Sequence, residues 1–439
     1  MKNIILLWIL FVLTAQTSFS QTFDKDKLDI YFKTLETNDK FMGNILVCKN
    51  GGKLYSYSAG YSNVENRIRS DESTMYRIGS ISKTFTAALV LKAVEEGKIS
   101  LSQNIVAFFP SIINAEIITI RQLLNHHSGI HNFTGSADFM NWHAQKKSEK
   151  EIVTIIAEGG SDFQPGSKAE YSNSNYVLLS YILEHTYKDR YENIINEKII
   201  GPLQLKHTRF GDRTIPQSYK TYSYTYEAGW QKEEDTDLSI PMGAGAIIST
   251  AGDLALFIDA LFSGKIISEE SLNAMKTQSD GYGMGLFKTY FSEKMSFHHN
   301  GRIDGFNSVF YYFPEEHIVF VMLSNAENYD INDINTSVLN CVFGKPFAVP
   351  VLNIYKITPA DLLPYFGVYT SKNSPLIITI SGKDNMLLAQ PKGQKIYTME
   401  ATAKDKFKHD KSGVTLEFNP SESKMIMKQG KQTLLFSKQ

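Results

Sequence analysis

The sequence contains only two cysteines, Cys48 and Cys341, among 439 residues. Two are too few for a disulfide-rich scaffold, and their spacing does not fit a zinc site. An exported protein could join them in one disulfide, but two buried thiols are the default expectation. The chain also lacks an excess of either charge, because 45 Lys and Arg stand against 46 Asp and Glu. A nucleic-acid partner is therefore not expected, since nucleic acids are bound through basic surfaces.

Beyond the N-terminus, the chain lacks any apolar run of the about 20 residues that span a bilayer. At the N-terminus, Lys2 is followed by an apolar run over residues 4–13 and by the small residues Ser18 and Ser20. This pattern predicts a signal peptide over residues 1–20, cleaved before Gln21; the alternative is an uncleaved anchor. We expect an exported mature protein, periplasmic or secreted, with no stable membrane span after cleavage.

Short apolar runs that favour strands lie near both ends of the first 350 residues. The runs 43–48 and 53–58 flank Asn50-Gly51-Gly52, which predicts a hairpin turn. The runs 306–313 and 317–323 flank a second turn signal, and the region 82–272 between the two sets has a helical pattern. The sequence therefore predicts one sheet assembled from the two ends of a domain, with helices covering it.

After residue 348, the chain becomes more basic and its apolar runs become short and separated by turns. We expect a first domain over residues 21–348, a linker over 349–358 and a small all-β domain over 359–439. Residues 371–439 hold 12 lysines and 6 acidic residues. This basic balance fits either an anionic envelope surface as a partner or, more simply, a solvated lysine-rich exterior.

The segment Ser80-Ile81-Ser82-Lys83 opens the most helix-like stretch of the chain. A lysine three residues after a serine lies on the same helix face, as a base beside a nucleophile requires. The amine takes the serine proton at neutral pH only if its pKa is lowered. The pattern recurs at Ser421 and Lys424, but there it lies in a polar, turn-like stretch where no pocket is expected.

Ser-x-x-Lys enzymes of the penicillin-recognising kind carry two further motifs. Tyr171-Ser172-Asn173 fits the second, with Tyr171 handing protons between groups and Asn173 binding a substrate carbonyl or amide; a packed tyrosine and a turn asparagine are the alternative. His299-Asn300-Gly301 fits the third.

Gly301 allows a substrate to lie close to the backbone of this strand edge. The backbone N–H groups of Ser80 and Arg302 would then form an oxyanion hole. A metal site is the alternative for the histidines of this region, although no His-Glu-x-x-His spacing occurs; the histidines concerned are His126, His127, His131, His298 and His299.

In these motifs the sequence resembles the serine β-lactamase and penicillin-binding protein superfamily, in its class C-like branch of esterases, D-amino-acid peptidases and related hydrolases. The resemblance covers about residues 25–345. It rests on the segments 76–86, 118–130, 201–203, 249–254 and 282–286 together with the motifs above. It implies an α+β fold: an antiparallel sheet flanked by helices, with an inserted, mostly helical lobe and the active site between them. The segment 363–369 likewise resembles a lipocalin-like barrel appendage.

The family roles carry over residue by residue. They imply Ser80 as the nucleophile, Lys83 and Tyr171 as shared general base and acid, Asn173 as a substrate amide ligand and His299 as an electrostatic contributor. Class C β-lactamases have lysine where His299 stands, so weak or no β-lactam hydrolysis is expected, because histidine is mostly neutral at pH 7. Arg302 is a candidate to supply a cation for an acidic substrate group; the alternative is that its side chain points to solvent.

These observations predict a serine hydrolase that needs no metal or cofactor. Its substrates would be small esters, D-amino-acid peptides or peptidoglycan fragments. The alternative is a penicillin-binding or cell-wall-binding protein that does not turn over. A metal-dependent hydrolase is a third reading.

Overall fold

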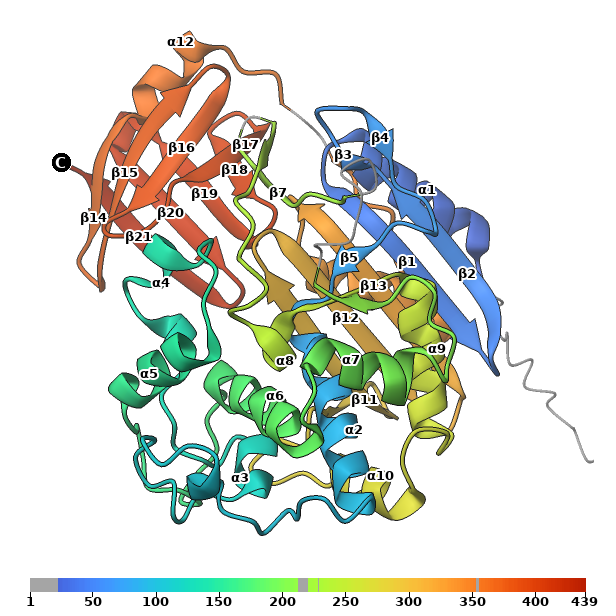
Figure 1. Cartoon of the computed structure of the whole chain (residues 1–439). Coiled ribbons are helices and arrows are strands. Elements are labelled where there is room, and N and C mark those ends of the chain that lie inside the picture. The colour runs from blue at the N-terminus through green and yellow to red at the C-terminus, as the bar shows by residue number, and fades with distance from the viewer. Residues whose placement is uncertain (1–22, 212–219, 228, 353–354) are drawn as a thin grey trace, which may run out of the picture.

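The computed structural model describes residues 23–211, 220–227, 229–352 and 355–439. The predicted signal peptide, residues 1–20, lies outside them. Figure 1 shows a larger unit, in which helices cover a sheet, beside a smaller C-terminal β-barrel in orange and red. Within the described ranges, no helix has both the length and the apolar character needed to cross a membrane. The α+β fold class predicted from the sequence is confirmed.

The two ends of the larger unit meet in one eight-stranded sheet, as the sequence predicted. Its main path runs β10-β11-β12-β13-β1-β2, and β7 and β8 extend it beside β13. The decisive pairing is antiparallel, between β1 and β13, with Val47 opposite Phe320. The strands are β1 (Phe41–Lys49), β2 (Gly52–Ala59), β7 (Tyr224–Tyr226), β8 (Trp230–Lys232), β10 (Phe287–Phe291), β11 (Lys294–Ile303), β12 (Phe306–Phe313) and β13 (Ile318–Glu327).

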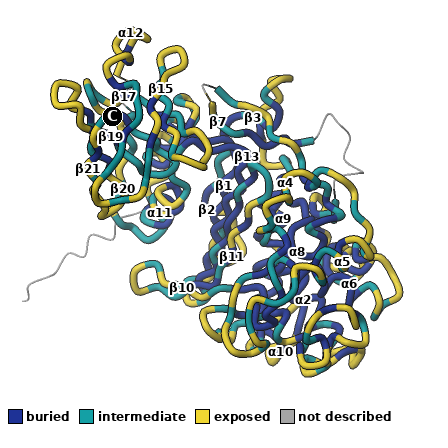
Figure 2. Tube along the Cα trace, turned by 90° about the vertical axis from the view of Figure 1, so that its left-hand side faces the viewer, coloured by how far each residue is buried: buried dark blue, intermediate teal, exposed yellow. Residues whose placement is uncertain are grey.

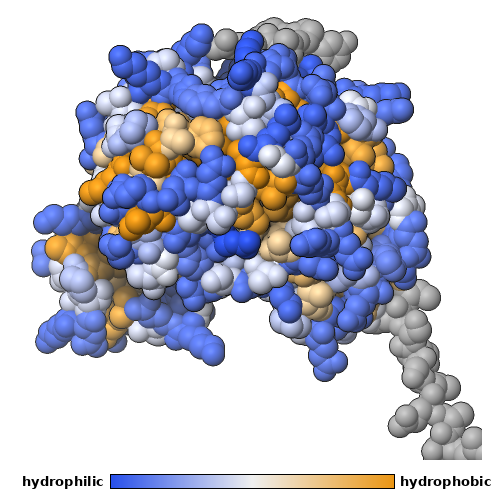
Figure 3. Space-filling view, turned by 60° about the horizontal axis from the view of Figure 1, so that its bottom comes forward, coloured by the Kyte–Doolittle hydropathy of each residue, from blue (hydrophilic) through white to orange (hydrophobic). Residues whose placement is uncertain are grey.

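Helices cover both faces of this sheet, which explains the continuous apolar run of β1. On one face, Val47 packs in a cluster with α1 (Lys25–Thr37) and α11 (Ile331–Val342). On the other face, Leu46 joins the large core beneath α9 (Ala251–Phe262). Figure 2 shows these central strands as mostly buried and the outer loops as exposed. On the face shown in Figure 3, hydrophilic residues predominate, and apolar residues form patches among them. The two cysteines are free and belong to these opposite faces; Cys341 is buried, whereas Cys48 is only partly so.

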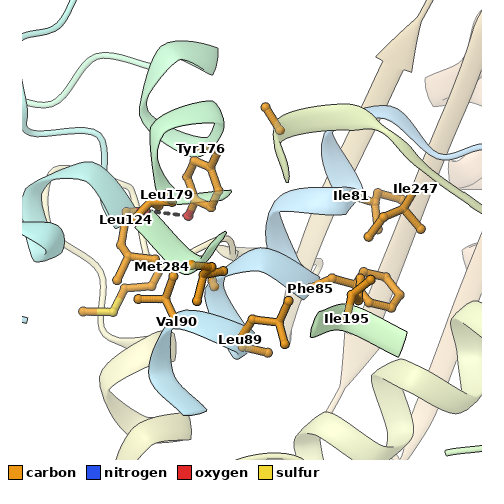
Figure 4. Packing of buried hydrophobic residues seen from close by; sticks show 14 of the residues in the cluster. Ile81, Phe85, Leu89, Val90, Leu124, Tyr176, Leu179, Ile195, Ile247 and Met284 are labelled. Atoms are coloured by element: carbon orange, nitrogen blue, oxygen red, sulfur yellow. Dashed lines mark hydrogen bonds between the residues drawn. The ribbon is translucent and has the colours of Figure 1, made fainter. Parts of the chain in front are cut away.

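The remaining helices form a lobe against the second face. Helix α2 (Ser82–Glu95) runs through its centre and is buried nearly all round, as its small and apolar residues require. Phe85 of α2 stacks on Phe257 of α9, with ring centroids 3.5 Å apart, and Figure 4 shows Phe85 and Leu89 among their neighbours in this core.

The other helices of this lobe are α3 (Ile120–Leu124), α4 (Phe139–Trp142), α5 (Glu149–Gly159), α6 (Asn173–Tyr187), α7 (Tyr191–Ile195), α8 (Met242–Gly245) and α10 (Glu269–Lys276), with 3₁₀ helices Gly79–Ile81, Ile105–Ala107 and Phe133–Gly135 and a π-helix Asn196–Ile200. Five short strands form two small sheets: β3 (Tyr61–Asn63) with β4 (Ile68–Arg69), and β5 (Tyr76–Arg77), β9 (Ile247–Ser249) and β6 (Arg209–Phe210).

The C-terminal unit is a closed barrel in which every strand pairs with its neighbours in the chain and β14 pairs with β21. It has its own apolar core. The helix α12 (Pro359–Leu362) and the 3₁₀ helix Leu363–Tyr365 precede it. Its strands are β14 (Gly367–Ser371), β15 (Ser374–Lys383), β16 (Met386–Pro391), β17 (Tyr397–Ala403), β18 (Lys406–His409), β19 (Val414–Asn419), β20 (Lys424–Gln429) and β21 (Gln432–Lys438); the 3₁₀ helix Pro420–Glu422 joins β19 and β20.

A buried ionic contact joins the two units. Lys40, of which 2% is exposed, lies 2.6 Å from Glu400 and 2.9 Å from Asp410 of the barrel. An unpaired charge at this depth would be costly, so the two carboxylates link the barrel to Lys40 of the larger unit. The domain limits at 348 and 359 stay a prediction, and residues 353–354 of the predicted linker lie outside the described residues.

Candidate active site

Ser80 lies in the 3₁₀ helix Gly79–Ile81, which leads directly into α2. The backbone at this point touches β11. Gly79 has φ +49°, and a Cβ there would lie 2.8 Å from the Arg302 nitrogen. A Cβ on Gly301 would lie 2.1 Å from the Ile78 carbonyl oxygen and 3.0 Å from the Ser80 nitrogen. Only glycine therefore allows this approach of the two segments, which places the backbone of Ser80 next to that of Arg302.

Lys83 is completely buried one helical turn after Ser80. Its Nζ lies 3.0 Å from Ser80 Oγ, and it donates to Asn173 Oδ1 and to the Ala244 carbonyl oxygen, each at 2.8 Å. Burial lowers the pKa of Lys83 well below its usual value, because a charged ammonium loses its hydration there. The amine is thus held against the serine in an environment that favours its neutral form.

Tyr171 reaches the same serine from the segment that precedes α6. Its hydroxyl donates to Ser80 Oγ at 2.8 Å. Burial raises the pKa of Tyr171 above its ordinary value, so the phenol keeps its proton at neutral pH. The serine oxygen therefore lies between a buried amine and a protonated phenol.

Asn173 lies beside Lys83, and both ends of its side chain are bonded: Oδ1 accepts from Lys83, and Nδ2 donates to Thr134 Oγ1 at 2.8 Å. The second N–H of Nδ2 is left for a substrate carbonyl, so the predicted role as a substrate ligand stays a prediction. In this structure, Asn173 is a partner that orients the lysine.

His126 supports Tyr171 on both sides, which the sequence reading did not foresee. The His126 carbonyl accepts from the Glu170 N–H at 2.9 Å, and its Nδ1 accepts from the Ser172 N–H at 3.1 Å. Its ring stacks on that of Tyr171, with centroids 4.6 Å apart. A backbone N–H can only donate, so Nδ1 carries no proton and the imidazole is neutral. Burial agrees with this tautomer, since it lowers the pKa of His126 well below the usual value.

The third motif lies on β11, beside the segment that carries Ser80. His299 is buried, and burial lowers its pKa to about 3, so it carries no charge at neutral pH. Gly301 lies against the backbone of Ile78 and Ser80. The roles of His299 as an electrostatic contributor and of Gly301 beside a substrate stay predictions. Arg302 is exposed and, because successive strand residues face opposite sides, its side chain points away from the serine. The Arg302 backbone lies against Gly79, next to Ser80.

Two alternatives raised by the sequence, a second Ser-x-x-Lys site and a metal site, lie apart from Ser80 or are not formed by the described residues. Ser421 donates to Asn419, Lys424 pairs with Glu422, and all four are exposed. Within the part of the chain that the structure describes, no three His, Cys, Asp or Glu side chains gather as metal ligands. His131 pairs instead with Asp162, and His127 with Asp280.

Comparison of this chain with known proteins identifies its family. The family model described as Beta-lactamase matches residues 38–337, which include every residue around Ser80 discussed above. The chain belongs to the beta-lactamase family. The barrel lies outside the matched range, so this beta-lactamase-family chain joins the family domain to a second, separate β unit.

Relatives of this beta-lactamase-family chain include hydrolases and penicillin-binding proteins. It is 26% identical over 399 residues to penicillin-binding protein 4* of Bacillus subtilis, covering 81% of this chain and 87% of the relative. It is 26% identical over 313 residues to a teichoic acid D-alanine hydrolase of Staphylococcus aureus, covering 70% and 75%. The crystal structure of a D-amino acid amidase from Ochrobactrum anthropi superposes with a TM-score of 0.62 at 25% identity, covering 72% and 98%.

Proposed function

We propose that this chain is an exported serine hydrolase that forms an acyl-enzyme on Ser80 and releases the acyl group to water. The observation that carries the proposal is the set of three contacts around Lys83. A neutral amine has two N–H donors and one lone pair. The donors go to Asn173 Oδ1 and the Ala244 carbonyl, which can only accept, so the lone pair is left for the Ser80 hydroxyl.

Acylation then follows from the positions of these groups. Lys83 takes the proton as Ser80 Oγ attacks the acyl carbon, and the N–H groups of Ser80 and Arg302 bind the oxyanion. The bond to the leaving oxygen or nitrogen breaks, and Tyr171 gives that atom a proton, which Lys83 replaces. Water next attacks the acyl-enzyme with the proton transfers reversed, which frees the acid and restores Ser80.

The substrates we propose are esters and amides of D-amino acids that lack a free carboxylate beside the scissile bond. Such a carboxylate needs a cation at the third motif, whereas His299 is neutral and the Arg302 side chain points away from Ser80. The hydrolase and amidase names of two relatives support this class. Carboxypeptidase substrates and β-lactams, which carry that anion, should be poor substrates.

The test compares D-alanine p-nitrophenyl ester, D-phenylalanine amide and D-alanyl-D-alanine as substrates of the purified chain without residues 1–20. We expect turnover of the first two and at least about tenfold lower kcat/KM for the dipeptide. Intact mass after quenching should show a transient acyl adduct at Ser80. A stable adduct without product would instead favour the penicillin-binding alternative, and faster cleavage of the dipeptide would contradict the proposed substrate class.

Replacement of Tyr171 by Phe is expected to lower kcat about 100-fold to 1,000-fold, with KM changed by less than about threefold. The variant keeps the ring that stacks on His126 but loses the proton donated to Ser80. Steady-state kinetics with the D-alanine ester measure this effect. Tyr181→Phe is the matched control, because Tyr181 is a buried tyrosine of α6. A rise in KM alone would make Tyr171 a group that positions substrate.

A further inference from the structure

The two ends of the C-terminal barrel differ in how they are closed. The 3₁₀ helix Leu363–Tyr365 covers one end, where the Tyr365 ring packs on Phe407 and Phe418 at 5.1 and 4.8 Å. The Tyr365 hydroxyl donates to Asp405 in the turn between β17 and β18 at this end. At the far end, which we call the open end, the strand ends and turns line a cavity instead.

A cavity of about 220 Å³ lies at this open end. Most of the side chains that line it are apolar and belong to the barrel core or its edge, among them Leu376, Ile378, Met399, Val414, Leu416 and Met427. The volume is below the about 300–1,000 Å³ of sites for drug-sized ligands. It suits a short, flexible hydrocarbon chain, which gains free energy by leaving water.

Four lysines lie in the turns at the open end. Three turns end there: Lys372 lies between β14 and β15, Lys392 and Lys395 between β16 and β17, and Lys431 between β20 and β21. These three turns contain no acidic residue, and all four lysines are exposed. Other barrel lysines, such as Lys424 and Lys428, have carboxylate partners, whereas none of these four has one within the described residues.

The charges at the covered end are different. Its turns carry Asp384, Asp405 and Glu422. The remaining turn at the open end, between β18 and β19, docks on the larger unit, where Asp410 pairs with Lys40 and Lys411 with Glu327. The four free amines are therefore a local feature of the open end and do not merely reflect the basic composition of the barrel.

We infer that the open end of the barrel binds a small amphiphilic carboxylate, with its alkyl chain in the cavity and its anionic group among Lys372, Lys392, Lys395 and Lys431. The apolar lining of the cavity would hold the alkyl chain, and the lysines of the turns at this end would attract the anionic group. A neutral alkyl compound would fill the cavity but make no contact with the lysines. A short anion would contact the lysines but leave the cavity empty. This site is independent of Ser80 chemistry.

The test uses the full mature chain carrying Ser80→Ala, titrated with sodium octanoate by calorimetry at low ionic strength. We expect saturable one-to-one binding, at least about tenfold weaker binding of octan-1-ol, which lacks the anion, and no measurable binding of acetate. Equal binding of octan-1-ol would overturn the role of the lysines. Equal binding of acetate would overturn the role of the cavity, and absence of octanoate binding would overturn the proposal.

Variants locate the octanoate on the barrel rather than near residue 80. Lys392→Gln with Lys395→Gln should weaken octanoate binding about threefold to tenfold. The matched pair Lys383→Gln with Lys404→Gln, at the covered end, should change it by less than about twofold. Val414→Phe and Ala389→Leu each fill part of the cavity and should weaken binding at least about tenfold. Thermal unfolding without ligand identifies a filled variant that fails to fold, and unchanged binding in a folded one would contradict the site.

Discussion

Replacement of Ser80 by Ala is expected to lower kcat on the D-alanine ester by about 10⁴-fold or more and to abolish the acyl adduct. The serine oxygen is the atom to which both Lys83 and Tyr171 are hydrogen-bonded, so its loss leaves the base and the acid without a nucleophile. Binding should change little, since a methyl-sized side chain still fits the partly exposed position of Ser80. A loss of kcat with a preserved KM is the expected signature.

The chain supplies its own control for this experiment. Ser421 is the other serine that stands three residues before a lysine, but it is exposed and bonded to Asn419 in the barrel. Ser421→Ala should therefore retain wild-type kcat. If Ser80→Ala kept more than about 1% of the activity while remaining folded, the nucleophile would have to be assigned elsewhere.

The contact between Lys83 and Ser80 could be predicted from local spacing alone. Ser80 and Lys83 are one helical turn apart, so a helix brings them together whatever the rest of the chain does. Tyr171 and Asn173 could be placed beside them only through the family resemblance, since about 90 residues of chain separate the two segments. In the same way, the apolar runs at both ends of the domain indicated that they share one sheet, but they did not indicate that β1 pairs with β13 or which residues face each other.

The features that the sequence did not reveal depend on tertiary contacts. The carbonyl and ring of His126 support a segment 44–46 residues further along the chain, and its own sequence, His-His-Ser-Gly, has only the character of a turn. The uncharged state of His299 depends on its complete burial, with the Phe287 ring of the adjacent strand β10 only 5.0 Å away. For Arg302 the sequence left a side chain pointing to solvent as an alternative, and the alternation of strand residues favours that alternative, because Gly301 lies against Ser80.

Replacement of Lys83 by Ala or Arg is expected to lower kcat about 1,000-fold or more. Alanine removes the base. Arginine keeps a positive charge but cannot lose its proton near neutral pH, so it cannot accept the proton of Ser80. Lys92→Ala, on the same helix but bonded only weakly to the Ile266 carbonyl at 3.4 Å, is the matched control and should keep wild-type kcat. Thermal unfolding shows whether the arginine variant folds.

The pH dependence separates this role of Lys83 from a structural one. The active form is the neutral amine, so kcat/KM should rise as pH increases through the pKa of Lys83 and then level off. Burial lowers that pKa, so the plateau should begin well below pH 10.5, the usual pKa of lysine. Ionisation of Tyr171 should not lower kcat/KM near neutral pH, because burial raises the pKa of this tyrosine. The rising limb should be absent from the residual activity of Lys83→Arg; if it persists there, another group is the base. Neither His126 nor His299 is expected to take that place, because burial lowers the pKa of both and keeps them neutral across the range in which the limb is measured.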